Sequence, residues 1–459
     1  MRILVVGGGG REHALVWKIA ASPLVQRLYC APGNAGIAET ATCVDIAAED
    51  IGGLLAFARD QRIDLTVCGP EMPLTMGIAD AFEEAGLKLF GPSRRGAEIE
   101  GSKIVAKRLL YRHAIPTAQF RVFDRPADAH RYVDSAQSGL VIKADGLAAG
   151  KGSVVCSSQE EALSTIDRIM VSPRLFGPAG NKIEIEERLE GRELMFFALS
   201  DGEAVLPLQS AMDYKQAYAA DEGVAIRLFN KLSGNPNLDN NPNTGGMGGF
   251  SPHPWLDEEL TDKIIKRIAV PTVRGFKEAT AQEYTGVIYF GLMISEEKDV
   301  HVLEINVRLG DPEAEVILPR LKTDFYQLSM AMLDRRLRGV PLEWSPNFCL
   351  GVCATSGRAI KPLSSGGSER PGYPGEHYTN MPISGLEKVD PDVLVYHNGT
   401  AFGNNAQGKR RLFTTGGRVL TLVARGRTLA EARNRAYDNI KRIRFNGMRY
   451  RKDIGLAYL

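Results

Sequence analysis

"LVIKADGLAAGKGSVVC", residues 140–156, places a glycine-rich loop between two apolar runs of β-type residues. A phosphate-binding loop of the GxxxxGK[ST] type has four residues between its glycines and a Ser or Thr after the lysine. Here three residues separate Gly146 from Gly150, and Gly152 follows Lys151. Strand-like residues also stand on both sides, whereas that motif leads from a strand into a helix. The stretch therefore predicts a glycine hairpin between two strands.

The predicted hairpin is suited to hold phosphate groups. Backbone N–H groups of a glycine loop can point at phosphate oxygens, so the loop could close over a triphosphate as a flap. Lys143 in the incoming strand and Lys151 on the loop supply positive charges for the same oxygens. A plain hairpin turn is the alternative, but it rarely needs so many permissive residues around a lysine. The pattern favours phosphate binding.

The first hundred residues alternate strand-like and helix-like runs. This alternation predicts a doubly wound parallel sheet whose ligands collect at the carboxyl ends of the strands. "CGPE" and "FGPS" each come just after such a strand. The predicted strands are residues 3–6, 28–30, 65–68 and 87–90.

The first of these strands leads into "VVGGGGREHA", residues 5–14. A dinucleotide fingerprint needs a third glycine where Glu12 or His13 stands, so this turn does not encode it. The turn can still bind an anion through its backbone N–H groups. Arg11 would pair with a phosphate, and Glu12 would accept hydrogen bonds from a ribose or an amine. A single phosphate therefore fits better than NAD, and a turn without a ligand is the alternative.

"VLEINVRLGDPE", residues 302–313, contains an acidic strand. Because side chains alternate along a strand, one face should carry Val302, Glu304, Asn306 and Arg308. The other face should carry Leu303, Ile305 and Val307. Glu304 and Asn306 offer two oxygen ligands for Mg²⁺, which often takes only one or two protein ligands beside substrate phosphates. A solvated edge strand is the alternative, but its exposed face would more often carry Lys, Thr or Ser.

Two further segments are compatible with a nucleotide site. In "IEIEERLEGREL", residues 183–194, a strand runs into a turn whose backbone could read an adenine edge, with Glu193 on ribose hydroxyls. An acidic, solvated turn is the alternative. The loop "NPNTGGMGGFSP", residues 241–252, offers backbone donors to an anion, and its alternative is a plain glycine-rich connection.

The composition gives no indication of a nucleic-acid or membrane partner. The chain of 459 residues has 56 Lys and Arg against 55 Asp and Glu, a net charge of +1. The basic run 441–452 is interpreted as a solvated helix face or tail. No apolar stretch approaches the roughly 20 residues of a membrane span, and no signal-peptide pattern opens the chain. Scattered cysteines without a CxxC pair are typical of reduced core thiols, and we expect a cytoplasmic protein.

Several motifs together resemble the ATP-grasp superfamily, and within it the glycinamide ribonucleotide synthetase (phosphoribosylamine–glycine ligase) family. The similarity extends over nearly the whole chain, with the motifs in the family's order. The motifs are "GGREHAL", "APGNAG", "GPE.PL", "EGSK", "IKADGLAAGKG", "PNTGGMG", "E.N.R.GDPE", "GYPG", "GGRVL" and "RKDIG".

The resemblance implies an α/β fold in three parts. Residues 1–102 form a doubly wound, Rossmann-like substrate-binding domain. Residues 103–335 form an ATP-grasp module of two α+β lobes, with a flap lobe at about 118–192. Residues 336–459 form a small mixed α/β C-terminal domain. A helix over 102–112, with Ser102 as its N-cap, opens the second part.

The resemblance also implies a reaction. ATP phosphorylates the carboxylate of glycine, and the amine of 5-phosphoribosylamine attacks the acyl phosphate to give glycinamide ribonucleotide, ADP and phosphate, a step of purine biosynthesis. Mg²⁺ or Mn²⁺ assists. Such chemistry relies on positioning and charge stabilisation, which agrees with the lack of a nucleophile triad in the sequence. The oligomeric state is open, with a monomer as the working expectation.

The family pattern assigns residues to each ligand. The catalytic set is Arg308, Lys151, Asp213 and Lys215. The ATP set is Lys103, Lys143, Gly146, Gly150, Lys151, Gly152, Glu186, Glu187, Leu189 and Glu193. Glu304 and Asn306 match the metal ligands. The set for phosphoribosylamine is Gly10, Arg11, Glu12, Pro70 and Glu71, and the glycine and the transferring phosphate would lie among Gly245, Gly246, Asp311 and the catalytic set.

The sequence also departs from the family pattern. "DYKQ" (213–216) has Gln216 in place of arginine, and an extension precedes Pro242. "DPEAEV" stands where "DPETQ" is usual, and another extension precedes "GYPG". A related ligase for another small acid or amine is therefore the alternative. An NAD-dependent oxidoreductase is disfavoured, because the opening turn lacks the glycines of a dinucleotide motif. A nucleotide-binding regulator without catalysis is disfavoured as well, because Glu304 and the flap lysine, which it would have lost, are both present.

Overall fold

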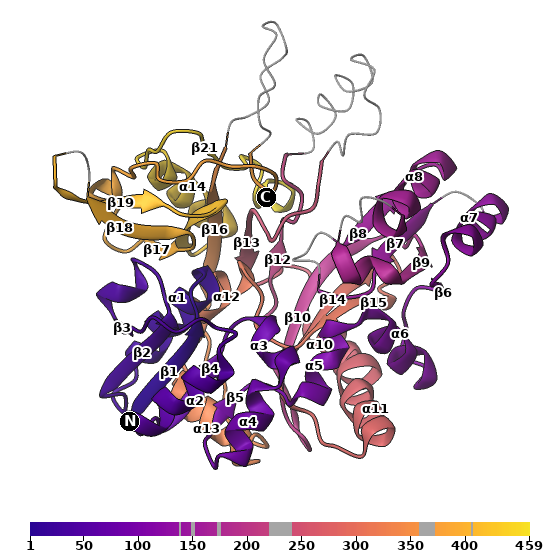
Figure 1. The fold of residues 1–459 in the computed structure, drawn as a ribbon, viewed down its shortest axis with the longest axis horizontal. Helices are drawn as coiled ribbons and strands as arrows, with labels where there is room; N and C mark the ends of the chain where they lie inside the picture. The colour runs from indigo at the N-terminus through magenta and orange to yellow at the C-terminus, as the bar shows by residue number, and fades with distance from the viewer. Residues whose placement is uncertain (137–138, 148–151, 172–175, 220–240, 358–371, 405–406) are drawn as a thin grey trace, which may run out of the picture.

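The computed structural model describes residues 1–459 except 137–138, 148–151, 172–175, 220–240, 358–371 and 405–406. Within these residues the chain forms α/β layers, with four sheets of four to six strands and a two-stranded hairpin. Figure 1 shows the N-terminal sheet on one side of the molecule and the predicted flap on the other. The strands β10 (Arg192–Asp201), β14 (Thr285–Ile294) and β15 (Val300–Asn306) lie between them.

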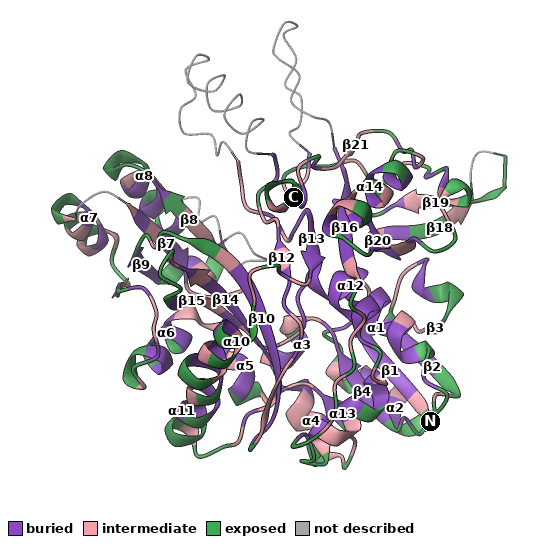
Figure 2. Cartoon of the chain, turned by 180° about the vertical axis from the view of Figure 1, so that it is seen from behind, coloured by how far each residue is buried: buried purple, intermediate pink, exposed green. Residues whose placement is uncertain are grey.

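The N-terminal region is the predicted doubly wound domain. Its five strands are all parallel in the order β3-β2-β1-β4-β5. Apolar residues on both faces bury β1 almost completely, as helices cover both sides (Figure 2). The strands are β1 (Arg2–Gly7), β2 (Arg27–Pro32), β3 (Thr42–Cys43), β4 (Leu65–Cys68) and β5 (Leu89–Phe90). The helices are α1 (Gly10–Ala20), α2 (Ile51–Asp60), α3 (Glu71–Met76), α4 (Ile78–Glu84) and α5 (Arg94–Gly101).

The flap lobe is a four-stranded antiparallel sheet in the order β6-β9-β7-β8. The hairpin prediction is confirmed, because β7 pairs antiparallel with β8 on either side of the glycine loop. The tip of that loop, with Gly150 and Lys151, lies outside the described residues. The strands are β6 (Phe120–Phe123), β7 (Leu140–Ala144), β8 (Ser153–Cys156) and β9 (Ile183–Glu187). The helices are α7 (Pro126–Ser135) and α8 (Gln159–Met170), followed by the short turn η2 (Gly177–Asn181).

The central sheet is antiparallel in the order β11-β10-β14-β15. Residues 258–280 form a continuous helical segment, with a π-helical turn, η3 (Ile265–Ala269), between α10 (Glu258–Ile264) and α11 (Val270–Thr280). Helix α6 (Lys103–Arg112) begins after Ser102, whose hydroxyl accepts a hydrogen bond from Val105 N, as predicted. The strands are β10 (Arg192–Asp201), β11 (Val205–Pro207), β14 (Thr285–Ile294) and β15 (Val300–Asn306).

A bulge in β15 corrects the predicted faces of this strand. Gly291 pairs with Glu304 and Leu292 with Val302, so Leu303 is an extra residue opposite β14. Two successive side chains therefore share one face, and the alternation shifts. Val302, predicted on the face of Glu304, is fully buried with Ile305 in the core, whereas Leu303 lies half-buried on the Glu304 side. The prediction was wrong for these two residues only.

The third sheet joins two parts of the chain. Its order is β12-β13-β16-β20-β17, and β12 and β13 come from the central region. The antiparallel pairing of β13 with β16 ties the third glycine loop to the C-terminal region. The strands are β12 (Met212–Asp213), β13 (Gly248–Ser251), β16 (Phe348–Ser356), β17 (Leu394–His397), β20 (Arg418–Gly426) and β21 (Met448–Arg449), with the separate hairpin β18 (Thr400–Asn404) and β19 (Arg410–Thr414). Further helices in the described residues include α12 (Glu313–Ile317), the short η4 (Leu318–Arg320), α13 (Phe325–Leu333) and α14 (Leu429–Ile440).

Buried apolar residues link the three regions. One core cluster joins the N-terminal sheet to β10, β14 and β15, and a second joins β1 and α1 to α12, α13 and β16. The six cysteines are free thiols, five of them buried, as predicted. No described helix is long and apolar enough to span a membrane. The loop after β15 thus lies where all three regions meet.

Candidate active site

Three lysines surround the carboxylate of Glu304. Lys215 Nζ lies 2.5 Å from Glu304 Oε1. Burial alone would raise the pKa of Glu304, but Lys215, with Lys143 and Lys103 further away, lowers it to about 2. In turn, burial would lower the pKa of Lys215, but Glu304, Glu193 and Asp213 raise it. The Glu304 carboxylate is therefore ionised at neutral pH and available as an oxygen ligand.

A second group of charges is buried between the flap lobe and β15. Lys143 Nζ lies 2.7 Å from Glu186 Oε1 and donates to the carbonyl of Leu303 at 2.8 Å. Lys107 Nζ lies 3.1 Å from the same Glu186 oxygen. Burial and the neighbouring charge of Glu186 raise the pKa of Glu184 to about 8. The Glu186 carboxylate thus binds both lysines, and the neighbouring Glu184 carboxyl keeps its proton at neutral pH.

The base of the flap is tied to helix α6. Ser102 Oγ donates to Asp145 Oδ1 at 2.8 Å, and Lys103 Nζ donates to the carbonyl of Gly146 at 3.1 Å. Gly146 has φ +146°, and a Cβ there would lie 2.8 Å from the Ala179 side chain. A larger residue would therefore strain the start of the loop. Gly152 is buried, and its carbonyl accepts from Ala144 N at 2.8 Å.

The predicted adenosine residues take different directions. The Glu186 side chain points inward to the lysines, whereas Glu187 is exposed and accepts from Gln119 N at 2.9 Å. Leu189 is half-buried. Glu193 lies on β10, near enough to Lys215 and Asp213 to affect their pKa values. The structure therefore brings Glu186 and Glu193, but not the Glu187 side chain, toward the charged groups.

Asp213 and the third glycine loop form the next part of the site. Asp213 is buried, and burial together with Glu313 raises its pKa well above the usual range. A Cβ on Gly246 would lie 3.0 Å from Asp213 Oδ1, so these two residues are immediate neighbours. Gly245 N donates to the hydroxyl of Tyr373 at 2.9 Å. The loop thereby joins Asp213 to the C-terminal region.

Arg418 and Asp311 form a second link to that region. Arg418 Nη1 lies 2.9 Å from Asp311 Oδ1 and donates to the carbonyls of Gly245, at 2.6 Å, and Asp311, at 3.1 Å. Behind this pair, Glu315 is fully buried, and burial and the charge of Asp311 raise its pKa well above the usual range. Gly10 N, at the start of α1, donates to Asn398 Oδ1 at 3.1 Å beside the same group.

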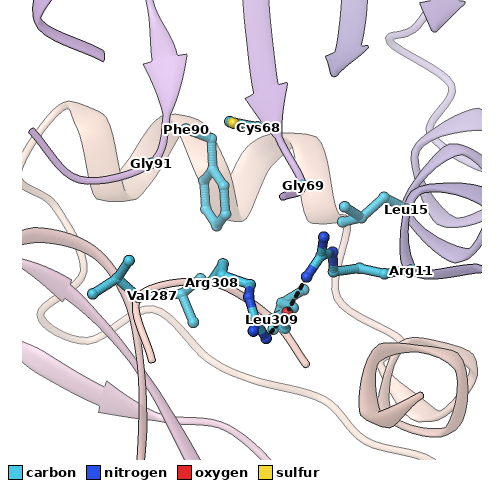
Figure 3. Close-up of a pocket in the computed structure, with 10 residues that line it drawn as sticks. Arg11, Leu15, Cys68, Gly69, Phe90, Gly91, Val287, Arg308 and Leu309 are labelled. Carbon is cyan, nitrogen blue, oxygen red and sulfur yellow. Dashed lines mark hydrogen bonds between the residues drawn. The ribbon is translucent and has the colours of Figure 1, made fainter. Parts of the chain in front are cut away.

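The opening loop leads to a cluster of arginines and glutamates, whose two arginines are drawn in Figure 3. Arg11 is 6% exposed; its Nε lies 2.6 Å from Glu12 Oε1, and its Nη1 donates to the carbonyl of Leu309 at 3.2 Å. Glu12 Oε2 also accepts from Gly9 N at 2.7 Å and so caps α1. Both carboxylate oxygens of Glu12 therefore already accept hydrogen bonds from within the loop.

Arg308 completes this cluster. Its Nε lies 3.1 Å from Glu71 Oε2, and its Nη2 lies 2.8 Å from Glu100 Oε1. Figure 3 shows Arg308 and Arg11 converging on the carbonyl of Leu309, beside a cavity of about 10 Å³, the volume of one water molecule. Burial would raise the pKa of Glu71, but Arg308 and Arg11 lower it to about 2. Pro70, just before Glu71, is the N-cap of α3.

The pair Glu304 and Asn306 fits a hard divalent cation. Both are half-buried on the same face of β15, and within the described ranges no other residue hydrogen-bonds to the Asn306 amide. Carboxylate and amide oxygens are the donors that Mg²⁺ prefers. The described part of the chain has no group of three or more His, Cys, Asp and Glu side chains placed to hold a metal. A metal at Glu304 and Asn306 would therefore need further ligands, as phosphate oxygens provide.

Comparison with known proteins identifies the family. Models of phosphoribosylglycinamide synthetase match the chain as its N domain over residues 1–100, its ATP-grasp (A) domain over 101–314 and its C domain over 370–457. The phosphoribosylamine–glycine ligase of Caldanaerobacter subterraneus subsp. tengcongensis is 43% identical over 458 residues, which span 100% of both chains. The chain belongs to the phosphoribosylamine–glycine ligase family.

Solved structures agree with this family. The phosphoribosylamine–glycine ligase of Thermotoga maritima has a TM-score of 0.78 and 28% identity, covering 99% of this chain and 100% of its own. The biotin carboxylase domain of a 2-oxoglutarate carboxylase from Hydrogenobacter thermophilus was solved with MgADP, ADP and bicarbonate. It has a TM-score of 0.67 at 14% identity, covering 98% and 91% of the two chains, which shows a shared fold. The predicted α/β fold with an ATP-grasp module is confirmed.

Several charged residues of this phosphoribosylamine–glycine ligase family member were not predicted. Lys107 lies one helical turn after Lys103, and Glu184 shares a strand face with Glu186, so spacing alone could have suggested both. Glu100 precedes the helix start in "EGSK", and Arg418 belongs to "GGRVL". Neither motif indicates a partner, because Arg308 and Asp311 reach them only through the tertiary fold.

Proposed function

We propose that this chain is an ATP-dependent carbon–nitrogen ligase that joins glycine to 5-phosphoribosylamine. The products are glycinamide ribonucleotide, ADP and phosphate, and the reaction is a step of purine biosynthesis. The observation that carries the proposal is the full-length similarity to curated phosphoribosylamine–glycine ligases. The lysine cluster around Glu304 supports it, because that cluster has the charge a polyphosphate requires.

The ATP end of the site is assigned to the region between the flap lobe and β15. Lys103 and Lys143 would neutralise phosphate oxygens, while the Gly146–Gly152 loop covers them; Lys151 belongs to this loop but lies outside the described residues. Glu186 orients Lys143, because it holds the ammonium 2.7 Å away. The backbone after Glu186, with Glu187 and Leu189, would face the adenine, and Glu193 the ribose.

Glu304 and Asn306 would hold Mg²⁺, or Mn²⁺ with the same preference for oxygen. When bound, the metal would neutralise charge on the phosphates and so favour phosphoryl transfer. The Lys215 ammonium already occupies Glu304 Oε1. We therefore propose that Lys215 shifts its hydrogen bond toward the transferring phosphate when the metal takes its place on that carboxylate.

Glycine activation is placed between β12 and the loop after β15. The carboxylate oxygen of glycine would attack the terminal phosphorus of ATP, with ADP as the leaving group, while Lys215 and Arg308 stabilise the developing charge. The residues assigned around glycine are Asp213, Gly245, Gly246 and Asp311. Their support is geometric, since Gly246 adjoins Asp213 and Arg418 ties Gly245 to Asp311.

Phosphoribosylamine is assigned to the opening loop. Its amine would attack the acyl carbon, phosphate would leave, and the amine would lose a proton. The backbone at Gly10, near the N-terminus of α1, is suited to the 5′-phosphate, because a helix N-terminus favours an anion. Arg11, Glu12, Pro70 and Glu71 would surround the ribose. Their support is that the Arg11–Glu71–Arg308 cluster connects this loop to the glycine side.

The division into domains 1–102, 103–335 and 336–459 is part of this proposal. The β13–β16 pairing crosses the second boundary, so we propose that the last two domains act as one body around the glycine site. We further propose that the enzyme works as a monomer in the cytoplasm.

Phosphate release tests the proposed function. The full chain would be assayed with MgATP, glycine and freshly generated phosphoribosylamine, and each component would be omitted in turn. We expect release to need all three and to match the glycinamide ribonucleotide formed. Release that is equal without glycine, or no release with the full set, would contradict the proposal. Faster turnover with another small acid or amine would favour the related-ligase alternative.

A further inference from the structure

A cavity of about 430 Å³ lies where the C-terminal sheet meets the segment after α12. Its walls come from η4, the residues just before β16, the end of β20 and the first turns of α14. Small-molecule pockets have volumes of roughly 300–1,000 Å³, so the space suits a ligand of metabolite size. None of the residues assigned to ATP, glycine, phosphoribosylamine or the metal lines it.

The walls carry an excess of positive charge. Four cations line the cavity, Lys322, Arg425, Arg427 and Arg435, against two acids, Asp392 and Glu431. Asp392 is ion-paired with Arg435, and Glu431 Oε2 accepts from the backbone N of Arg427 at 2.8 Å. In the part of the chain that the structure describes, the side chains of Lys322, Arg425 and Arg427 form no ion pair.

A buried cation lies behind this wall. Arg320 is 3% exposed and donates only to neutral acceptors, which include the carbonyls of Asn347, at 2.8 Å, and Ser345, at 3.1 Å. Both of those residues line the cavity. Burial lowers the pKa of Arg320 to about 10, with Cys349 as the one group that opposes the shift. A buried charge without a counter-ion is costly, so a nearby anion would stabilise it.

Arg425 connects the buried cation to the cavity. Burial raises the pKa of the Cys349 thiol to about 12, against the charges of Arg320 and Arg425. Arg425 on β20 is also the register partner of Cys349 on β16, so these two side chains lie on the same face of the sheet. Arg425 is half-buried, lines the cavity and has no carboxylate partner among the described residues. Among the described residues, neither Arg320 nor Arg425 therefore has a carboxylate partner at this wall.

We propose that this cavity binds a phosphorylated small molecule, with its phosphate group at Arg425 and its sugar or nucleoside facing Ser345 and Asn347. A phosphate dianion matches the two-charge excess of the walls, and a guanidinium can bind two of its oxygens at once. The first turn of α14, a helix of twelve residues, adds a favourable dipole at the same wall. The cavity is larger than a phosphate alone requires, which leaves room for a sugar.

Hydrogen–deuterium exchange of the full chain tests this site separately from the catalytic one. The probes are ribose 5-phosphate, inorganic phosphate, ribose and malonate, each titrated against peptides covering residues 344–350 and 424–432. We expect ribose 5-phosphate to protect both peptides, inorganic phosphate to do so more weakly, and ribose to have no effect. Arg425→Gln should raise the midpoint concentration at least tenfold, and Arg427→Gln should raise it less.

Arg411→Gln is the matched control, because Arg411 is an exposed arginine on β19 in the same region. It should leave the midpoint unchanged. Loss of protection in the Arg425 variant, with its melting temperature retained, supports the site. No protection with the native chain, or an unchanged midpoint in both Arg425→Gln and Arg427→Gln, would overturn it. Equal protection by malonate would overturn the choice of phosphate as the recognised group.

Discussion

Two charged clusters flank the loop after β15, and they differ in how their charges are balanced. Around Glu186 and Glu304 stand four lysines, Lys103, Lys107, Lys143 and Lys215, while Glu184 keeps its proton. On the other side, Arg11 and Arg308 face Glu12, Glu71 and Glu100. The lysine cluster has positive charge in excess, whereas the arginine cluster is already neutralised by its own carboxylates.

The difference indicates two roles. A buried excess of positive charge favours the binding of an anion, which supports the polyphosphate proposed at the lysine cluster. The arginine cluster has rigid, paired hydrogen bonds that join the N-terminal domain to the loop after β15. We therefore propose that Arg11 acts near the assigned phosphoribosylamine site mainly by holding its surroundings in place.

The largest effect is expected from the lysine cluster at Glu304. Glu304→Gln removes the charge that holds Lys215 and one of the two proposed metal ligands. Turnover should fall by about 100-fold or more, the scale on which the loss of one electrostatic group acts in catalysis. Steady-state kinetics would measure it, with the melting temperature as a check on folding. Glu296→Gln is the control, because Glu296 is exposed in the β14–β15 connection. Unchanged kinetics in Glu304→Gln would show that Glu304 is not part of the site.

A pair of lysine variants separates binding from stability. Lys143→Met and Lys107→Met each remove one of the two ammonium groups on Glu186. Each should lower the free energy of unfolding by about 1–3 kcal/mol, because a buried carboxylate loses a partner. Only Lys143→Met should also raise the KM for ATP, by roughly tenfold. Equal KM values in the two variants would show that Lys143 does not contact the nucleotide.

The arginine cluster should give a smaller and different response. Arg11→Ala leaves Glu12 without its side-chain partner and takes one cation from Glu71. The KM for phosphoribosylamine should rise by about tenfold, a loss of roughly 1.4 kcal/mol, with little change in the KM for ATP. Initial rates with each substrate varied in turn would decide it. If the KM for ATP rises instead, the opening loop binds a phosphate of ATP rather than the phosphate of phosphoribosylamine.

The sequence could predict the parts of this site that depend on local pattern. Glycine spacing and the strand-like flanks correctly distinguished the hairpin at residues 140–156 from a strand–loop–helix motif of the GxxxxGK[ST] type. Alternation correctly placed Ile305 and Val307 in the core. It failed at Val302 and Leu303, because the bulge is set by pairing with β14, a strand whose register no single-sequence pattern encodes.

Charge pairing over long distances in the chain was equally out of reach. Glu100 and Arg308 are far apart in sequence, and the Arg418–Asp311 pair joins two regions. Arg11 shows the same limit from the other side. Its position in a glycine turn predicts a guanidinium that is free to bind a phosphate. The fold instead buries the Arg11 side chain against Glu12 and Leu309. Residue type and spacing indicate which chemistry is present, whereas packing decides which charges are still free.

The smallest expected effect concerns the proton on Glu184. The groups that face it are Glu186, Lys143 and Lys107, and burial with Glu186 raises its pKa to about 8. A carboxyl whose pKa is higher in the folded protein stabilises the fold at low pH. That contribution is lost as pH rises from the ordinary carboxyl range through about 8, by up to about 1.4 kcal/mol per pH unit.

Glu184→Gln keeps the shape and the neutral state of this side chain but cannot ionise. The variant should match the native chain at pH values below the ordinary carboxyl range, about pH 4, and become the more stable of the two as pH rises toward 9. Urea unfolding at several pH values would measure the difference, with Glu296→Gln as an exposed control that leaves the profile unchanged. Parallel pH profiles for the native chain and Glu184→Gln would mean that Glu184 is ionised in the folded protein. The lysine cluster would then contain one more negative charge, and its contrast with the arginine cluster would shrink.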